Sequence, residues 1–205
     1  MKRKFNDPSD PLLMSVRSGA KFSMPGMMDT VLNIGLNKKI LAGLIKKTGN
    51  ERFARDCWRR LLQMYGEVVL GVHKDKFEKS LHKMRKKYKV KNDPELPAKA
   101  LAELGEQYEE FIKEAGVKMP TDPWDQLIGG IRAVFISWNT ERARAYRNAN
   151  RIPHDLGTAV NCQAMVFGNI DETCGSGVMF TRNPSTGEKK LYGEFLTVSY
   201  THLTL

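Results

Sequence analysis

Apolar residues recur at helical spacing through the middle of the chain, and breaks divide this pattern into four predicted helices. The first ends at Thr48, where Thr48-Gly49-Asn50 interrupts it, and the second begins near Glu51. The third covers residues 74–87 and the fourth 98–115, with Pro94 and Pro97 between them. The apolar faces are formed by Leu41, Leu44, Ile45; Phe53, Trp58, Leu61, Leu62, Tyr65; Phe77, Leu81, Met84; and Leu101, Leu104, Tyr108, Phe111, Ile112.

A further helical stretch follows Pro123. From Trp124 to about Asn150 the pattern predicts helix, with an arginine-rich turn at its end. The apolar side of this stretch is formed by Leu127, Ile131, Val134, Phe135 and Trp138.

Strand patterns lie at both ends of the chain. A short apolar run at residues 12–16 predicts a buried strand, and the methionine-rich stretch 24–30 predicts a shaped loop. Residues 158–167 alternate in polarity, and a loop at 175–177 leads into another strand that ends near Arg182. The turn signal at 183–187 predicts a hairpin whose return strand covers 188–195. Helices followed by antiparallel strands indicate an α+β fold.

Composition excludes several classes of protein. Hydrophobic residues make up 41% of the 205 residues and charged residues 27%, which is typical of a globular protein rather than a disordered or fibrous one. No apolar run approaches the roughly 18 residues of a membrane-spanning helix. Three scattered cysteines form neither a disulfide framework nor a CxxC zinc site, so we expect a reducing, cytoplasmic setting.

The net charge of +10 is concentrated in one segment. Residues 38–91 carry 17 basic and 5 acidic side chains, whereas residues 92–205 carry 11 basic and 15 acidic ones. A lysine-rich stripe from Lys83 to Lys91, with Tyr88 inside it, could bind nucleic acid. Because one aromatic makes a poor stacking platform, a solvated helix face is the preferred interpretation.

Two glycine-bearing segments could bind phosphate. Arg17-Ser18-Gly19-Ala20 follows a predicted strand, where the planar guanidinium can make two charge-assisted hydrogen bonds. Gly175-Ser176-Gly177 could present backbone N–H groups to phosphate oxygens. Each segment is also compatible with a simple turn. The four histidines form no metal or catalytic constellation, and no nucleophile elbow is present, so neither a metal site nor hydrolase chemistry is predicted.

Taken together, several strings resemble the nucleotide-binding domain of the pyruvate phosphate dikinase family. The longest are PLLMSVRSGA, SMPGMMDT and FTRNPSTGE, and the resemblance runs from about residue 5 to 196. The shorter matches are Thr48-Gly49-Asn50 with Arg52-Phe53, Gln63-Met64-Tyr65, Gly157-Thr158-Ala159-Val160-Asn161, Met165-Val166-Phe167-Gly168-Asn169 and Gly175-Ser176-Gly177-Val178.

The resemblance implies an enzyme that makes phosphoenolpyruvate, AMP and diphosphate from pyruvate, ATP and phosphate, or runs in reverse. It also implies an ATP-grasp-like fold, in which two α+β lobes close on ATP. Residues 1–37 and 120–162 would then form part of the first lobe. Residues 38–119 would be an inserted all-helical subdomain, and residues 163–196 would begin the second lobe.

The same resemblance implies roles for individual residues. Arg17 matches the arginine that contacts ATP phosphates and stabilises charge during phosphoryl transfer. Gly175, Ser176 and Gly177 match a glycine loop over the phosphates, and Thr181 and Arg182 follow on its exit strand. Gln163, Met165 and Val166 match the strand joining the lobes, whose backbone could read the adenine edge or simply pair within the sheet.

The chain also departs from the family pattern. Family members are several times longer, with an upstream lysine that reaches the phosphates and downstream parts that hold Mg²⁺, the phosphohistidine and pyruvate. We therefore expect this chain to be a fragment of a homo-oligomeric phosphotransferase and to be inactive alone, with residues 197–205 an aberrant tail. The alternatives are a basic helical interaction or nucleic-acid-binding module, and an inert truncated fragment.

Overall fold

The computed structural model describes residues 3–197 and divides them into two compact units, the first ending at Met165 and the second beginning at Val166. The first unit contains six α-helices and three strands within the described part, and the second contains one hairpin. Mixed helices and antiparallel strands confirm the α+β class. Most of the tail expected at 197–205 lies outside the described residues.

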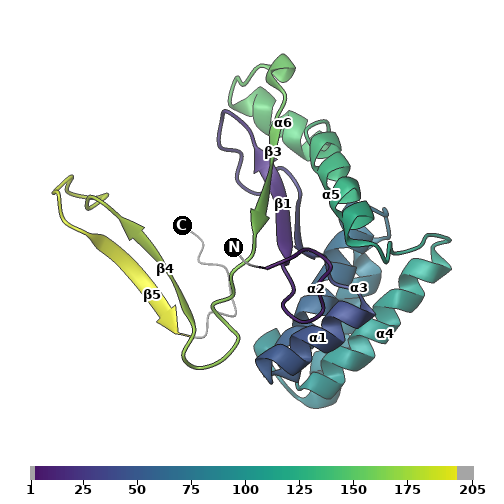
Figure 1. Cartoon of the computed structure of the whole chain (residues 1–205). Helices are drawn as coiled ribbons and strands as arrows, with labels where there is room; N and C mark the ends of the chain where they lie inside the picture. The colour runs from purple at the N-terminus through teal and green to yellow at the C-terminus, as the bar shows by residue number, and fades with distance from the viewer. Residues whose placement is uncertain (1–2, 198–205) are drawn as a thin grey trace. The chain divides into compact units, whose positions relative to one another are not determined.

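Four helices occupy the middle of the first unit, as the apolar periodicity predicts (Figure 1). They are α1 (Lys38–Thr48), α2 (Glu51–Val68), α3 (Lys74–Tyr88) and α4 (Ala98–Glu114), with a 3₁₀ turn, η1 (Asp93–Glu95), before α4. The break between α1 and α2 has a local cause. Gly49 ends α1 in the left-handed region at φ 65°, and the Asn50 side chain then accepts from Phe53 N to cap α2.

The helical stretch after Pro123 is two helices rather than one. Helix α5 (Pro123–Ser137) has Trp138 as its C-cap, and α6 (Glu141–Ala149) begins after Thr140, whose hydroxyl accepts from Ala143 N. A 3₁₀ turn, η2 (His154–Leu156), follows. No helix within residues 3–197 is both long enough and apolar enough to cross a membrane.

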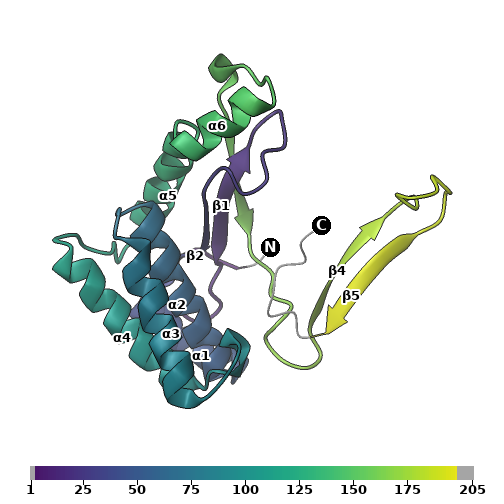
Figure 2. The ribbon, with the colours of Figure 1, turned by 180° about the vertical axis from the view of Figure 1, so that it is seen from behind.

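A three-stranded antiparallel sheet joins the two ends of the first unit. Its order is β2 (Thr30–Ile34), β1 (Met14–Gly19), β3 (Ala159–Ala164), with β1 central. The structure therefore adds β2 to the predicted strands, directly after the methionine-rich loop. Figure 2 shows α5 and α6 along one side of this sheet.

Helix α2 lies at the centre of the core. It packs against α4 on one side and β2 on the other, and Leu61, Leu62 and Tyr65 are almost completely buried. Phe77 of α3 meets Tyr108 of α4 edge-to-face at 4.9 Å between ring centroids. The helices and the sheet therefore share one apolar core.

The second unit is built on a hairpin. Strand β4 (Gly175–Phe180) pairs antiparallel with β5 (Tyr192–Thr197), from Gly175 opposite Thr197 to Phe180 opposite Tyr192. The predicted turn is confirmed: Gly187 N donates to Asn183 O at 2.9 Å, and Gly187 has φ 75°. The return strand begins at Tyr192 rather than at residue 188.

Gly43 provides a test of how tightly α1 packs. In a helix interior, Gly→Ala ordinarily stabilises by about 1 kcal/mol. Here a Cβ would lie 2.7 Å from the Pro8 carbonyl carbon and 3.0 Å from Pro8 Cα. We therefore expect Gly43→Ala to lower the free energy of unfolding by about 1–3 kcal/mol, measured by urea denaturation. The exposed Lys46→Ala on the same helix is the control, and stabilisation by Gly43→Ala would contradict the packing.

Candidate functional site

One face of the three-stranded sheet carries polar side chains from all three strands. Arg17 lies opposite Thr30 of β2 and Asn161 of β3, and Ser15 lies opposite Gln163. Directly opposed residues of antiparallel strands, and residues two apart along a strand, point to the same face. We call these five residues, Ser15, Arg17, Thr30, Asn161 and Gln163, the polar face.

The opposite face of the sheet packs against helices. Val16 and Val31 are paired across β1 and β2, and both are completely buried. A Cβ at Gly130 of α5 would lie 3.7 Å from Val16 Cγ2 and 3.0 Å from Ile34 Cδ1, so this helix sits directly on that side. The helices thus support the sheet from one side, while Arg17, Asn161 and Gln163 are exposed on the other.

Arg17 has an uncommitted guanidinium. Among residues 3–197, no ion pair or side-chain hydrogen bond involves it. Arg142, by contrast, bonds Asp29 and the Met27 carbonyl, and Arg147 bonds the Trp138 carbonyl. A fixed central strand therefore presents a cation whose donors are free for an anionic ligand.

Gly19 makes room beside Arg17. A Cβ at this position would lie 2.9 Å from Asn161 Nδ2, so a larger residue would displace the Asn161 side chain. Glycine therefore allows the amide of Asn161 to lie next to the strand that carries Arg17. This favours a packing role for Gly19.

The methionine-rich loop after β1 is held by its own small core. Met27 N donates to Met24 O at 3.1 Å across Pro25-Gly26, and Gly26 has φ 69°, as a type II turn requires. Met24 and Met28 pack with Trp138, Ala143 and Ile152. The loop that joins β1 to β2 is therefore anchored to the region around α6.

Strand β3 places Gln163 on the polar face and ends just before Met165. Met165 N donates to Leu13 O at 2.8 Å, and its sulfur accepts from Asn33 N at 3.1 Å, so Met165 is tied back to the sheet. Because β3 is an edge strand, it leaves alternate backbone groups unpaired within its sheet. Val166, which opens the second unit, is 85% exposed.

The predicted glycine loop is a strand. Gly175, Ser176 and Gly177 pair with Thr197, Leu196 and Phe195, so the expectation of a free loop is wrong. The physical reason is the Phe195 ring, which lies 2.8 Å (Cε2) from the Cβ position of Gly175 and 3.4 Å (Cδ2) from that of Gly177. The alternating glycines accept the ring of the opposite strand, a packing role that Gly-x-Gly spacing alone does not reveal.

Thr181 and Arg182 lie beyond the end of β4 rather than on it. Both are exposed, and Arg182 Nη1 donates to the Gly187 carbonyl at 3.2 Å, which holds it against its own turn. The structure therefore brings Arg17 and Gln163 together on the polar face. It places Val166, Gly175, Ser176, Gly177, Thr181 and Arg182 in the second unit.

Sequence reasoning missed Ser15, Thr30 and Asn161. Residues two apart along a strand share a face, so Ser15 could have been placed beside Arg17, and Asn161 beside Gln163, from the sequence alone. Thr30 had no such signal, because β2 was not predicted. Only the register of the three strands brings these side chains together.

Cys57 and His154 lie away from the polar face, and their environments within the fold indicate structural roles. Burial raises the pKa of the Cys57 thiol, so it stays protonated. His154 accepts from Arg147 Nε at 2.9 Å and contacts Asn148 Oδ1 at 2.8 Å. Within residues 3–197, no three His, Cys, Asp or Glu side chains are grouped to hold a metal ion.

The lysine-rich stripe is partly engaged within the fold. Lys87 Nζ lies 2.5 Å from Glu103 Oε2, and the Tyr88 hydroxyl donates to Glu103 Oε1 at 3.3 Å. The Tyr88 hydroxyl is thus bound to α4, and Lys87 Nζ lies 5.6 Å from the centroid of the Tyr88 ring. These contacts favour a structural role for this end of the lysine-rich stripe.

Known proteins are similar to this chain over nearly its whole length. The family model described as "Pyruvate phosphate dikinase, AMP/ATP-binding domain" matches residues 1–199. The chain is 56% identical over 196 residues to "Pyruvate, phosphate dikinase" of Clostridium symbiosum, covering 95% of this chain and 22% of that protein. It is 59% identical over 191 residues to "Pyruvate, phosphate dikinase 1, chloroplastic" of Arabidopsis thaliana, covering 93% and 20%. The chain thus spans about a fifth of the length of the curated relatives that it matches.

Proposed function

Because this chain belongs to the pyruvate phosphate dikinase AMP/ATP-binding domain family, we propose that its polar face binds the phosphates of ATP. Arg17 would neutralise charge as a phosphoryl group leaves the nucleotide. In the parent enzyme that group would pass to an enzyme histidine and then to pyruvate. The overall reaction is ATP + pyruvate + phosphate = AMP + phosphoenolpyruvate + diphosphate.

The observation that carries this proposal is the free guanidinium of Arg17. Its strand is fixed between two others, and its neighbours Asn161 and Thr30 add amide and hydroxyl groups that can bond phosphate oxygens. An exposed arginine without a carboxylate partner keeps its donors available to an anion, and the strand fixes the position of the backbone that carries it.

We further propose an ATP-grasp-like arrangement. Residues 1–37 and 120–162 would build the first lobe, an assignment supported by the pairing of β1 with β3 in one sheet. Residues 38–119, which hold α1 to α4, would be the inserted helical subdomain, and residues 163–196 would begin the second lobe. These boundaries are predictions from the family resemblance.

The remaining candidate residues would complete the nucleotide site. The edge strand β3 and its continuation, with Gln163, Met165 and Val166, would offer backbone groups to adenine. Gly175, Ser176 and Gly177 would contact the nucleotide as part of a strand, and Thr181 and Arg182 from the connection that follows it. The tie between Met165 N and Leu13 O leaves the Met165 carbonyl as its backbone contribution.

Mg²⁺ in nucleotide sites is usually held by one or two carboxylates together with the substrate phosphates, and within residues 3–197 no three His, Cys, Asp or Glu side chains are grouped to hold a metal ion. We propose that its ligands, the phosphohistidine and the pyruvate site belong to other parts of the parent enzyme. The isolated chain would then bind nucleotide without forming phosphoenolpyruvate. A homo-oligomeric parent and a cytoplasmic location stay predictions.

Replacing Arg17 tests the proposal. We expect Arg17→Ala to weaken ATP binding about 10- to 100-fold, the loss of a charge-assisted hydrogen-bonding group, measured by calorimetry on the whole chain. Arg17→Lys keeps the charge but loses the planar guanidinium, so its affinity for ATP should lie between those of the wild type and Arg17→Ala. Arg144→Ala on α6 is the matched control, since Arg144 is also exposed and carries the same charge. Equal affinity of Arg17→Ala and wild type, or no wild-type binding at millimolar ATP, would contradict the proposal.

A further inference from the structure

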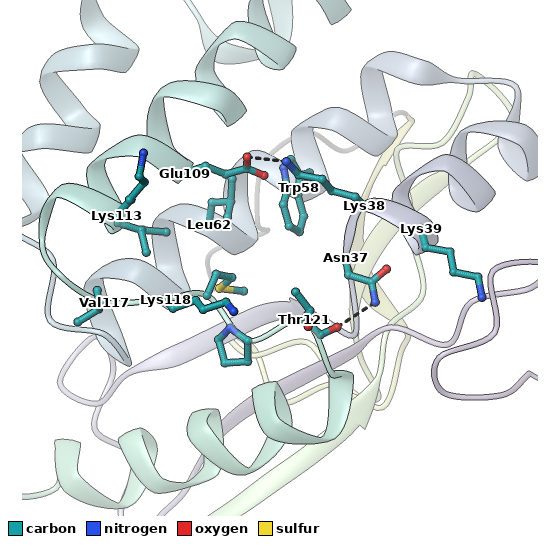
Figure 3. A pocket seen from close by; sticks show the side chains of 13 residues that line it. Asn37, Lys38, Lys39, Trp58, Leu62, Glu109, Lys113, Val117, Lys118 and Thr121 are labelled. Atoms are coloured by element: carbon teal, nitrogen blue, oxygen red, sulfur yellow. Dashed lines mark hydrogen bonds and ion pairs between the residues drawn. The ribbon is translucent and has the colours of Figure 1, made fainter.

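A pocket of about 840 Å³ lies among the helices of the first unit (Figure 3). The beginning of α1, the middle of α2, the end of α4 and residues 117–121 form its walls. It is separate from the polar face in its residues, since the two share none. Its volume falls within the range of pockets that hold small organic ligands.

The floor of the pocket is apolar and rigid. Trp58 and Leu62 come from α2 and Ile112 from α4, and all three are buried side chains of the core. Val117 and Met119 extend the apolar lining along the connection to α5. A flat or branched hydrocarbon group placed here would leave water for a preformed apolar surface.

The rim of the pocket is cationic. Four lysines line it, and the only carboxylate in the lining is Glu109. Lys38 neutralises that carboxylate at 2.8 Å between Nζ and Oε2, as the dashed line in Figure 3 marks. Lys113 pairs with Glu110 outside the lining, at 3.5 Å between Nζ and Oε1, so Lys39 and Lys118 are the lysines in excess and the lining favours an anion.

Lys118 is the best placed of these lysines. Figure 3 shows its side chain toward the middle of the lining, whereas Lys39 and Lys113 lie at the margins. Among residues 3–197, the Lys118 ammonium has no ion pair or side-chain hydrogen bond. An apolar floor with an unpaired ammonium beside it is complementary to a ligand that has an apolar body and a negative charge.

We propose that this pocket binds a small amphipathic anion: an apolar aryl or acyl body on the Trp58–Leu62–Ile112 floor, with its carboxylate at Lys118. The site is independent of the nucleotide site. Its occupant would also tie the connection before α5 to α1, α2 and α4, where Asn37 Nδ2 already donates to Thr121 O at 3.0 Å. Binding would therefore stabilise the folded chain.

The test uses 2-naphthoate as the probe and the indole N–H resonances of the three tryptophans as reporters. Titration of the whole chain should shift the Trp58 signal, while Trp124 and Trp138, which lie outside the pocket, should stay unmoved. The neutral 2-naphthamide should bind roughly three- to tenfold more weakly, and added salt should weaken naphthoate binding.

Matched variants separate the pocket from other sites. Lys118→Gln should weaken naphthoate binding about three- to fivefold, whereas Lys83→Gln on α3, an equal charge change away from the pocket, should leave it unchanged. Arg17→Ala should also leave it unchanged. No Trp58 shift at millimolar probe, equal affinity for the amide, or loss of the shift on Arg17→Ala would each overturn the proposal.

Discussion

Replacing Asp56 with alanine is expected to lower the free energy of unfolding by about 3–5 kcal/mol, because it leaves a buried charge without its partner. Asp56 and Arg59 of α2 are each 4% exposed. Asp56 Oδ1 lies 2.9 Å from Arg59 Nη2, and Asp56 Oδ2 lies 2.9 Å from Arg60 Nε. Burial by itself lowers the pKa of Arg59, but the Asp56 carboxylate together with Tyr108 and Asp93 raises that pKa overall, so Arg59 remains charged.

Urea denaturation measures this loss, with Glu51→Ala as the control. Glu51 pairs with Arg55 on the exposed side of the same helix, at 2.6 Å, and such pairs contribute less than about 1 kcal/mol. The double replacement Asp56→Leu with Arg59→Met should recover most of the stability, since it removes both buried charges. A loss below about 1 kcal/mol for Asp56→Ala would show that water reaches Arg59.

Replacing Gln126 with leucine is expected to cost about 3 kcal/mol of stability. The side chain is completely buried, and it bonds three backbone groups: its Oε1 accepts from Gly35 N at 2.9 Å, and its Nε2 donates to Leu36 O and Pro120 O, each at 2.8 Å. Leucine has a similar volume, so no cavity forms. The expected loss of stability comes from the three buried backbone groups that are left without hydrogen-bond partners.

Thermal and urea unfolding of Gln126→Leu should be compared with Gln107→Leu. Gln107 is exposed on α4 and bonds the Ser80 hydroxyl, so its replacement should cost less than about 1 kcal/mol. Similar losses for the two variants would contradict the bridging role of Gln126. Hydrogen exchange at Gly35 N–H should also quicken in Gln126→Leu, because this amide loses its acceptor.

The basic segment 38–91 has contacts within the fold that account for part of its charge. From the sequence, a solvated helix face was the preferred interpretation of its lysine-rich stripe, and nucleic-acid binding was the alternative. In the structure, Arg59 and Arg60 bind Asp56, and Lys87 binds Glu103. Part of the charge therefore stabilises the helices, while the pocket collects Lys38, Lys39, Lys113 and Lys118 from segments far apart in sequence.

Periodicity identified helices but not all of their environments. Leu127, Val134 and Trp138 are buried as predicted, whereas Phe135 of the same helix is 48% exposed. Helix α5 is apolar on more than one side, so its sequence could not indicate which side faces the sheet. The break at Trp138–Thr140 was hidden for the same reason, since the apolar pattern continues up to it.

By itself, the sequence determined the helices α1 to α4, the hairpin turn and the family of the chain. These depend on local spacing, capping residues such as Asn50, turn residues such as Gly187, and long specific strings. Only the tertiary structure decided the strand order, the strand identity of Gly175–Gly177, the bridging role of Gln126 and the pocket. Each of these needs residues distant in sequence, such as Arg17 beside Asn161 or Gly35 bonded to Gln126. Such pairs form because packing of the whole core selects one register, and no local pattern contains that information.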